Sequence, residues 1–260
     1  MKDTGIIVSH GGKIIYVFGK AVSPYEDLWE DHSYIGINLD TGRVDDIRNN
    51  YPKLVRFEDL TDEQQLVLSQ HIPIRHAFST GIMTISALAR SGKDMLADSV
   101  CRKTFADRRS LADPIREIAS ITLGEVEGKN RESLILIGQG LRREDPNIWI
   151  KVWLRREIEA TKEHGTFCTV VPDVRQPNEF TFFKSLGALT VKIETDEKKR
   201  LDKIREVDGE TALNEKLLND ETESHVEGFE TDLTIFNDYD EHFIEDIDNS
   251  VVHALKERGW

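Results

Sequence analysis

The first part of the chain, up to about residue 80, alternates short apolar, β-branched runs with glycine-containing turns. Residues 5–20 (GIIVSHGGKIIYVFGK) place two such runs around Gly11-Gly12, and residues 33–47 (SYIGINLDTGRVDDI) repeat the arrangement around Asp40-Thr41-Gly42. Two β-prone runs joined by a turn of this kind are typical of a β-hairpin. Residues 53–60 (KLVRFEDL) contain a further short strand candidate. This pattern predicts a small β-rich module.

Residues 61–72 (TDEQQLVLSQHI) carry a helix signal instead. Thr61 and Gln64 have the spacing of a capping box, in which each side chain bonds the backbone N–H of the other residue. We expect a short helix that closes the module between Pro73 and Thr80. The histidines of this part have no ligand-like spacing, and we expect them at the solvated surface: His10, His32, His71 and His76.

From Gly81 onward, runs of strand length alternate with helical patterns. The expected strands lie within residues 81–89, 166–174, 188–195 and 231–238. The expected helices run from about Lys93 to Lys103 and within residues 113–123, 131–141, 145–165, 177–187 and 239–259. Alternation of this kind predicts an α/β fold, with a parallel sheet that helices cover on both faces. Ligands of such sheets bind beyond the carboxyl ends of the strands.

Composition narrows the classes of function. With 34 basic and 48 acidic residues, the chain has a formal charge of −14, which favours small-molecule partners over a nucleic-acid polymer. The apolar fraction of 38% is enough for a sizeable core. The two cysteines, Cys101 and Cys168, form neither a metal cluster nor a disulfide framework, and we expect buried thiols. The sequence has no secretory signal and no apolar run of membrane-spanning length, so we expect a cytoplasmic protein.

One loop carries candidate chemistry. Residues 87–94 (ALARSGKD) resemble the phosphate-binding pattern G-x-x-x-x-G-K-[ST], but only Gly92 and Lys93 match it. Ala87 stands where the first glycine is usual, and Asp94 stands where a metal-binding hydroxyl is usual. The loop lies between a predicted strand and a predicted helix, where backbone N–H groups and the helix N-terminus can hold phosphate. A surface turn before a helix is the alternative interpretation.

A second strand end supports the phosphate interpretation. Asp173 and Arg175 follow the buried run of residues 166–171, and Pro172 ends that run. A carboxylate near a phosphate loop can hold Mg²⁺-bound water, and a guanidinium can bind phosphate through two hydrogen bonds. The two strand ends together predict a site that binds nucleotide phosphate.

With these residues in view, the sequence resembles phage-type deoxynucleoside monophosphate kinases. The segments that carry the resemblance occur in the same order and span about residues 81–258: ARSGKDMLAD, LADPIREIA, GQGLRREDPNIWIK, VVPDVRQPNEF and ETESHVEGF…TDLTIFND. That family is similar to animal phosphomevalonate kinases, which share an S-G-K-D loop, so Asp94 is a family trait. Ala87, the GLRRED segment and the N-terminal module depart from the family.

The resemblance implies a P-loop NTPase sheet of the nucleoside monophosphate kinase type. It implies transfer of the γ-phosphoryl group of ATP, with Mg²⁺, to a deoxynucleoside 5′-monophosphate. We expect a module over residues 1–79, a kinase domain over residues 80–260 and a lid around residues 196–225. If a phage encodes the chain, its place is the host cytoplasm; a homodimer is left open. The alternatives are a kinase of another phosphorylated acceptor or modified nucleotide, and a nucleotide-binding sensor.

The resemblance also assigns residues to roles. Those implied to bind ATP are Ala89, Arg90, Ser91, Gly92, Lys93, Asp94, Met95 and Arg200. Those implied to bind the acceptor are Asp113, Arg116, Gln139, Trp149, Arg175 and His225. Asp94 and Asp173 would hold Mg²⁺, and Lys93, Arg142, Asp173 and Arg175 would act in the transfer. Two of these roles have plain alternatives, because Trp149 could be a core aromatic and His225 an exposed histidine.

Overall fold

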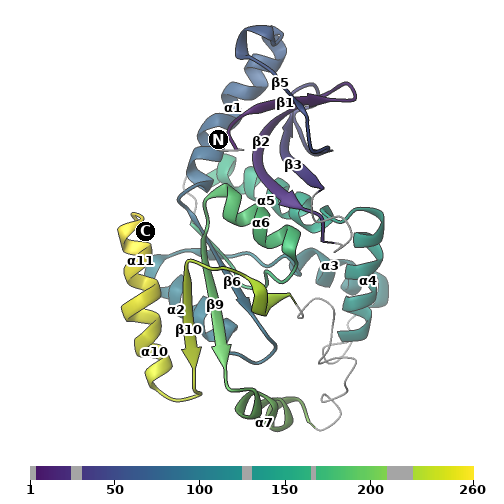
Figure 1. Cartoon of the computed structure of the whole chain (residues 1–260). Helices are drawn as coiled ribbons and strands as arrows, with labels where there is room; N and C mark the ends of the chain where they lie inside the picture. The colour runs from purple at the N-terminus through teal and green to yellow at the C-terminus, as the bar shows by residue number, and fades with distance from the viewer. Residues whose placement is uncertain (1–3, 25–30, 125–130, 165–167, 210–224) are drawn as a thin grey trace. The chain divides into compact units, whose positions relative to one another are not determined.

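A computed structural model describes residues 4–24, 31–124, 131–164, 168–209 and 225–260. The chain divides into two compact units, and each unit is built from separate stretches of sequence (Figure 1). Unit 1 comprises Met1–Ala77 and Arg109–Thr166, and unit 2 comprises Phe78–Arg108 and Phe167–Trp260. The sequence predicted a division into residues 1–79 and 80–260. The observed division differs, because the helices between residues 109 and 166 group with the N-terminal module.

Unit 1 contains the β-rich module as a separate antiparallel sheet. Its strands follow the order β4-β3-β2-β1-β5. They are β1 (Ile7–His10), β2 (Lys13–Val22), β3 (His32–Asn38), β4 (Arg43–Arg48) and the very short β5 (Lys53–Leu54). Both predicted hairpins are confirmed, since His10 pairs with Lys13 and Asn38 pairs with Arg43. Strands β2 and β3 approach so closely that a side chain on Gly36 would collide with the Tyr16 carbonyl oxygen.

The helix predicted after the module is present but longer than expected. Helix α1 (Asp62–Phe78) follows a short 3₁₀ turn at Phe57–Asp59 and continues through Pro73. The capping box is confirmed, because the Thr61 N–H donates to Gln64 Oε1 at 2.9 Å and the Gln64 N–H donates to Thr61 Oγ1 at 3.3 Å. The last turns carry the buried side chains Ile74 and Phe78, so packing extends the helix beyond the proline.

Three further helices belong to unit 1: α3 (Asp113–Leu123), α4 (Arg131–Glu144) and α5 (Ile148–His164). A largely buried ion pair between Lys151 and Asp46 connects α5 to the sheet. Lys151 Nζ lies 3.0 Å from Asp46 Oδ1 of β4 and 2.5 Å from Asp145 Oδ2, and Asp46 is 7% exposed. These contacts are the physical reason why residues 109–166 group with the module rather than with the parallel sheet.

Unit 2 is the predicted α/β fold. Its parallel sheet has the strand order β10-β9-β6-β8-β7, with β6 (Ile82–Ala87) in the centre. The other strands are β7 (Asp107–Arg108), β8 (Thr169–Val171), β9 (Leu189–Thr195) and β10 (Leu233–Asn237). The sequence did not predict β7, because two residues are too short for a periodic signal.

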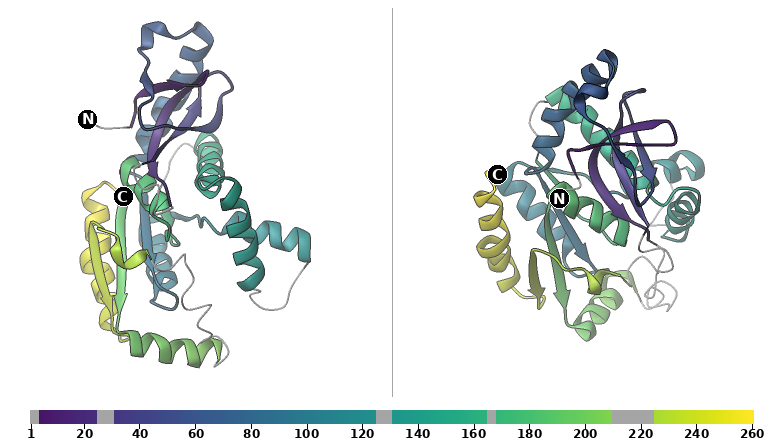
Figure 2. Two further views of the ribbon diagram at one scale, coloured as in Figure 1. Left: turned by 45° about the vertical axis from the view of Figure 1, so that its right-hand side comes forward. Right: turned by 45° about the horizontal axis from the view of Figure 1, so that its top comes forward.

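Helices flank this sheet. They are α2 (Lys93–Thr104), α6 (Pro177–Leu186), α7 (Glu197–Asp208), α10 (His242–Asp246) and α11 (His253–Glu257). A π-helical segment, Ile247–Val252, joins the last two, and a 3₁₀ turn lies at Val226–Gly228. Figure 1 draws α6 in front of the sheet and α2 behind it, and Figure 2 shows α10 and α11 running beside β10.

The core of unit 2 lies where α2 and the C-terminal helices meet the strands. Leu96, Val100, Phe243 and Val251 join β-strand side chains in one buried cluster. Cys101 and Cys168 are half-buried free thiols at its edge, and burial raises the pKa of each. Within the described ranges, no helix is long and apolar enough to cross a membrane.

Candidate functional site

The loop between β6 and α2 is a tight turn. Arg90 and Gly92 have positive φ values of 64° and 94°, a conformation that favours glycine. A Cβ on Gly92 would lie 2.5 Å from Asn237 Nδ2 and 3.0 Å from Phe243 Cε1. Both conformation and space therefore require glycine at position 92.

The end of β10 holds the loop in place. Asn237 Nδ2 donates to the Ser91 carbonyl oxygen at 3.0 Å, and the Tyr239 hydroxyl donates to the Arg90 carbonyl oxygen at 3.1 Å. Asn237 is 3% exposed, so its bond is shielded from water. Carbonyl oxygens would repel an anion. These bonds hold two of the loop's carbonyl oxygens on the side of the loop that faces β10. The first N–H groups of α2 have no partner within the helix and lie at the positive end of its dipole. The loop can therefore bind an anion such as phosphate.

Two cations surround Asp94 at the start of α2. Lys93 Nζ lies 2.9 Å from Asp94 Oδ2, and Arg108 of β7 binds Asp94 Oδ1 and, at 2.9 Å, Asp98. Burial opposes ionisation of Asp94, but the hydrogen bonds and charges of Lys93 and Arg108 outweigh it and lower its pKa to about 2. Asp94 is thus a carboxylate at neutral pH. Because the Lys93–Asp94 pair is solvent-accessible, it is weak, and a phosphate can replace Asp94 as the partner of Lys93.

The chain after β8 is fixed at the same edge of the sheet. The Val174 N–H donates to the Ile85 carbonyl oxygen at 3.2 Å, which joins this segment to the end of β6. Glu179 Oε2 accepts the N–H groups of Arg175 and Gln176, both at 3.1 Å, as part of the capping box of α6. The backbone on either side of Asp173 is therefore held next to the strand that carries the loop.

Arg200 brings a buried cation to this edge. It lies in the first turn of α7, directly after β9, and is only 6% exposed. Its Nη1 has no hydrogen-bond partner among the described residues, and its Nη2 lies 4.0 Å from Glu197 Oε1. Burial raises the pKa of Tyr239, and the Arg200 charge opposes that rise, so the two groups are neighbours.

The Ser91 side chain is a second buried donor at this edge of the sheet. Its hydroxyl is buried in the loop, and it has no hydrogen-bond partner among the described residues. Buried polar groups are costly to leave unbonded. Ser91 and Arg200 together therefore offer donors to an anionic ligand at the carboxyl ends of β6 and β9.

The residues expected to bind the acceptor lie mostly in unit 1. The Asp113 carboxylate accepts the Ser110 N–H at 2.9 Å and pairs with Arg116 at 2.7 Å, at the start of α3. Gln139 and Arg142 are half-buried on α4.

Trp149 is a core residue. Its side chain is 2% exposed, and its indole N–H donates to the Gly138 carbonyl oxygen of α4 at 3.1 Å. A ring buried in this way has no free face for a nucleobase, so the core interpretation of Trp149 replaces the substrate-binding one.

The other expected residues belong to unit 2. Met95 is 49% exposed on α2, and Ala89 is half-buried in the loop. His225 is half-buried just before the 3₁₀ turn at Val226–Gly228. Of the lid expected around residues 196–225, the structure shows α7, whereas residues 210–224 lie outside the described part.

Sequence reasoning missed three residues that shape the loop: Arg108, Asn237 and Tyr239. Asn237 ends the last apolar run, so alignment of the carboxyl ends of all the predicted parallel strands could have found it and the neighbouring Tyr239. Arg108 had no signal, because β7 is not predictable from sequence. All three act through backbone or ionic contacts with the loop and the start of α2.

The donor set is compatible with Mg²⁺. The described residues include no cluster of three or more histidine, cysteine or acidic side chains that could hold a metal by themselves. Mg²⁺ does not need one, because it is commonly held by one or two carboxylates together with substrate phosphates and water. The sequence assigns this role to Asp94, which is ionised at neutral pH, and to Asp173.

No protein-family model matches the chain, and no curated protein matches it. Among solved structures, it is similar to a presumed kinase from Chloroflexus aurantiacus, with 14% identity, a TM-score of 0.48, and 69% of this chain and 97% of that one covered. It is also similar to shikimate kinase from Aquifex aeolicus, with 12% identity, a TM-score of 0.36, and 68% of this chain and 98% of that one covered. Dephospho-CoA kinase from Campylobacter jejuni has 14% identity and a TM-score of 0.39, with 67% of this chain and 97% of that one covered. These likenesses are distant, so the site rests on the geometry described above.

Proposed function

We propose that the chain is an ATP-dependent phosphotransferase that moves the γ-phosphoryl group of ATP to a deoxynucleoside 5′-monophosphate. The observation that supports this most strongly is the loop itself. Asn237 and Tyr239 hold its carbonyl oxygens on one side, while Lys93 and the N-terminus of α2 present positive charge. A strand, loop and helix with a lysine at this position bind the phosphates of a nucleoside triphosphate.

In the proposed reaction the protein supplies position and charge rather than a nucleophile. An oxygen of the acceptor phosphate attacks the γ-phosphorus, and negative charge spreads over the transferring group. Lys93, Arg175 and Arg200 are the cations that would stabilise this charge. A bound Mg²⁺, held by Asp94 and Asp173, would neutralise phosphate charge as well. Burial of Arg200 strengthens its effect, because charges interact more strongly where water is excluded.

The acceptor class is proposed from the resemblance of the segments at residues 111–119 and 138–151 to phage-type deoxynucleoside monophosphate kinases. Asp113, Arg116, Gln139, Arg142 and His225 are the residues that we assign to acceptor binding. Trp149 is left out, because its ring is buried.

The test is a turnover assay with ATP, Mg²⁺ and a panel of ribo- and deoxynucleoside monophosphates, in which ADP formation is measured. We expect ADP only when a deoxynucleoside monophosphate is present. Turnover only with a different phosphorylated acceptor would contradict the proposed acceptor class, but it would still support a phosphotransferase. Tight ATP binding without turnover on any acceptor would contradict the enzyme and favour the nucleotide sensor.

A further inference from the structure

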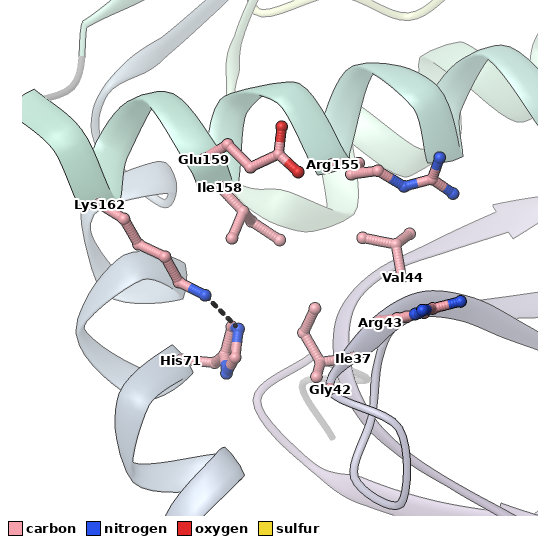
Figure 3. A pocket seen from close by; sticks show the side chains of 9 residues that line it. All are labelled: Ile37, Gly42, Arg43, Val44, His71, Arg155, Ile158, Glu159 and Lys162. Carbon is pink, nitrogen blue, oxygen red and sulfur yellow. Dashed lines mark hydrogen bonds between the residues drawn. The ribbon is translucent and has the colours of Figure 1, made fainter.

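Unit 1 contains a pocket that the proposed reaction does not use. It has a volume of about 340 Å³ and lies between the β3–β4 turn, α1 and α5 (Figure 3). Small-molecule sites begin at roughly 300 Å³, so the pocket is large enough for a compact metabolite. None of its lining residues belongs to the loop between β6 and α2.

The lining is rich in positive charge. Arg43 comes from the β3–β4 turn, and Arg155 and Lys162 come from α5, whereas Glu159 is the acidic residue of the lining. Within the part of the chain that the structure describes, none of these cations lies within 4.0 Å of a carboxylate. This concentration of positive charge is notable in a chain with a net charge of −14.

One wall is fixed by a buried histidine. His71 is 2% exposed, which corrects the expectation of a surface residue. Its Nδ1 lies 2.7 Å from the Val67 carbonyl oxygen and therefore carries the proton, so Nε2 accepts a hydrogen bond from Lys162 Nζ at 3.3 Å. Burial lowers the pKa of His71, which keeps the ring neutral at pH 7. The ring thus holds the Lys162 ammonium group at the pocket without cancelling its charge.

The cationic groups lie at the two ends of the pocket, and apolar side chains line its middle. Figure 3 shows Arg43 and Arg155 at one end and Lys162 with His71 at the other, with Ile158 between them. Ile37 and Val44, on the strands opposite α5, face Ile158 across the pocket (Figure 3). A ligand that fits this arrangement has an anionic head, a short apolar body and a polar group at the far end.

We propose that this pocket binds a small phosphate ester, with its phosphate at Arg43 and Arg155 and its body against Ile158. Two guanidinium groups match a phosphate dianion, because each can donate two parallel hydrogen bonds to its oxygens. The lining carries three cations and one carboxylate, which balances the charge of a phosphate monoester.

The test follows the ring signals of His71 by NMR while phenyl phosphate is added to the full-length Lys93→Ala protein. Phenyl phosphate is the probe because it combines a phosphate dianion with an apolar body. The Lys93→Ala background weakens binding at the loop, and a His71→Gln variant identifies the His71 signals. We expect a saturable shift of these signals and weaker binding of inorganic phosphate, which lacks the apolar body.

Two charge variants decide the outcome. Arg155→Gln should weaken phenyl phosphate binding by roughly tenfold, which is the loss expected for a charged hydrogen bond. Lys53→Gln removes the same charge from the exposed strand β5, outside the pocket, and should leave binding unchanged. An unsaturable shift, or an equal loss in both variants, would overturn the proposal. Because the readout is binding in a Lys93 variant, its result is independent of whether the chain transfers phosphate.

Discussion

At the scale of single residues, the start of α2 is a balance of charges. Asp94 replaces the hydroxyl of the usual loop pattern and is bound by Lys93 and Arg108. The carboxylate therefore has two cationic partners before any ligand arrives. A nucleotide phosphate would compete with it for Lys93, while Arg108 would keep Asp94 ionised and in place.

Replacement of Lys93 should separate catalysis from folding. Lys93→Ala removes a charge that, in the proposed function, binds the phosphates, so we expect phosphoryl transfer to fall by roughly 10²-fold or more. Among the described residues, the side-chain partner of Lys93 is the exposed Asp94, so the melting temperature should change little. Lys103→Ala, in the last turn of the same helix, is the matched control and should keep its activity. Full activity in a folded Lys93→Ala protein would contradict the proposed function.

Replacement of Arg108 should be visible in the ionisation of Asp94. The pKa of Asp94 is about 2, below its ordinary value of 3.8, so its ionic contacts contribute to stability above about pH 4. That contribution is lost as the pH falls toward 2. Arg108→Gln removes one cation and should raise the pKa of Asp94 in the folded state. The difference between the pKa of Asp94 in the folded state and in the unfolded state then becomes smaller. A ¹³C NMR titration of the Asp94 carboxyl group measures this; an unchanged midpoint would show that Arg108 has no such role.

At the scale of elements, the loop depends on a strand that is distant in sequence. β10 ends almost 150 residues after the loop, yet Asn237 and Tyr239 bind the Arg90 and Ser91 carbonyl oxygens. Arg90 is held at a positive φ, which is costly for a residue with a side chain. The hydrogen bonds from the β10 end help to offset this cost before a ligand binds.

Loss of the Tyr239 hydroxyl should loosen the loop without unfolding the protein. Tyr239→Phe removes the bond to Arg90 and keeps the ring, so we expect ATP affinity to fall by roughly three- to tenfold, the value of one hydrogen bond. Tyr51→Phe is the control, because Tyr51 is 91% exposed. Calorimetric titration with ATP measures the difference. Equal affinity in both variants would mean that the loop keeps its shape without this bond.

At the scale of the whole molecule, the chain forms units that its sequence order does not suggest. Residues 109–166 group with the N-terminal sheet rather than with the parallel sheet. The buried Asp46 lies at the centre of the contacts between these residues and the N-terminal sheet. Burial opposes ionisation of Asp46, but the charges of Lys151 and Arg48 outweigh it and lower its pKa. Asp46 is therefore a carboxylate that stabilises cations around it.

Removal of Asp46 should destabilise unit 1. Asp46→Ala leaves Lys151 partly buried with only Asp145 as a partner, so we expect the free energy of unfolding to fall by about 2–3 kcal/mol. Urea denaturation followed by tryptophan fluorescence measures this, because Trp149 and Trp153 are buried in unit 1. Asp59→Ala breaks an exposed pair with Arg56 and should change stability little. A similar effect of both substitutions would contradict the importance of burial at Asp46.

Local sequence patterns predict much of the fold. The hairpins, the capping box of α1 and the alternating strands and helices of unit 2 were all predictable, because each depends on residues that are neighbours in sequence. So was the position of the loop between β6 and α2. The predictions for His71 and Trp149 were wrong for one common reason. Partners from other elements bury both side chains, and no local sequence pattern shows those partners.

The sequence by itself determined the parallel α/β sheet, the antiparallel N-terminal sheet and the placement of Lys93 at the start of a helix. Only the tertiary structure decided which residues surround that helix, because the carboxyl ends of β6, β7, β8, β9 and β10 meet through sheet pairing rather than chain order. It also decided the grouping of α3, α4 and α5 with the N-terminal sheet, since this depends on long-range ion pairs and burial. The position of the loop between β6 and α2 could be predicted from the sequence, but the residues of β7 and β10 that contact it could not.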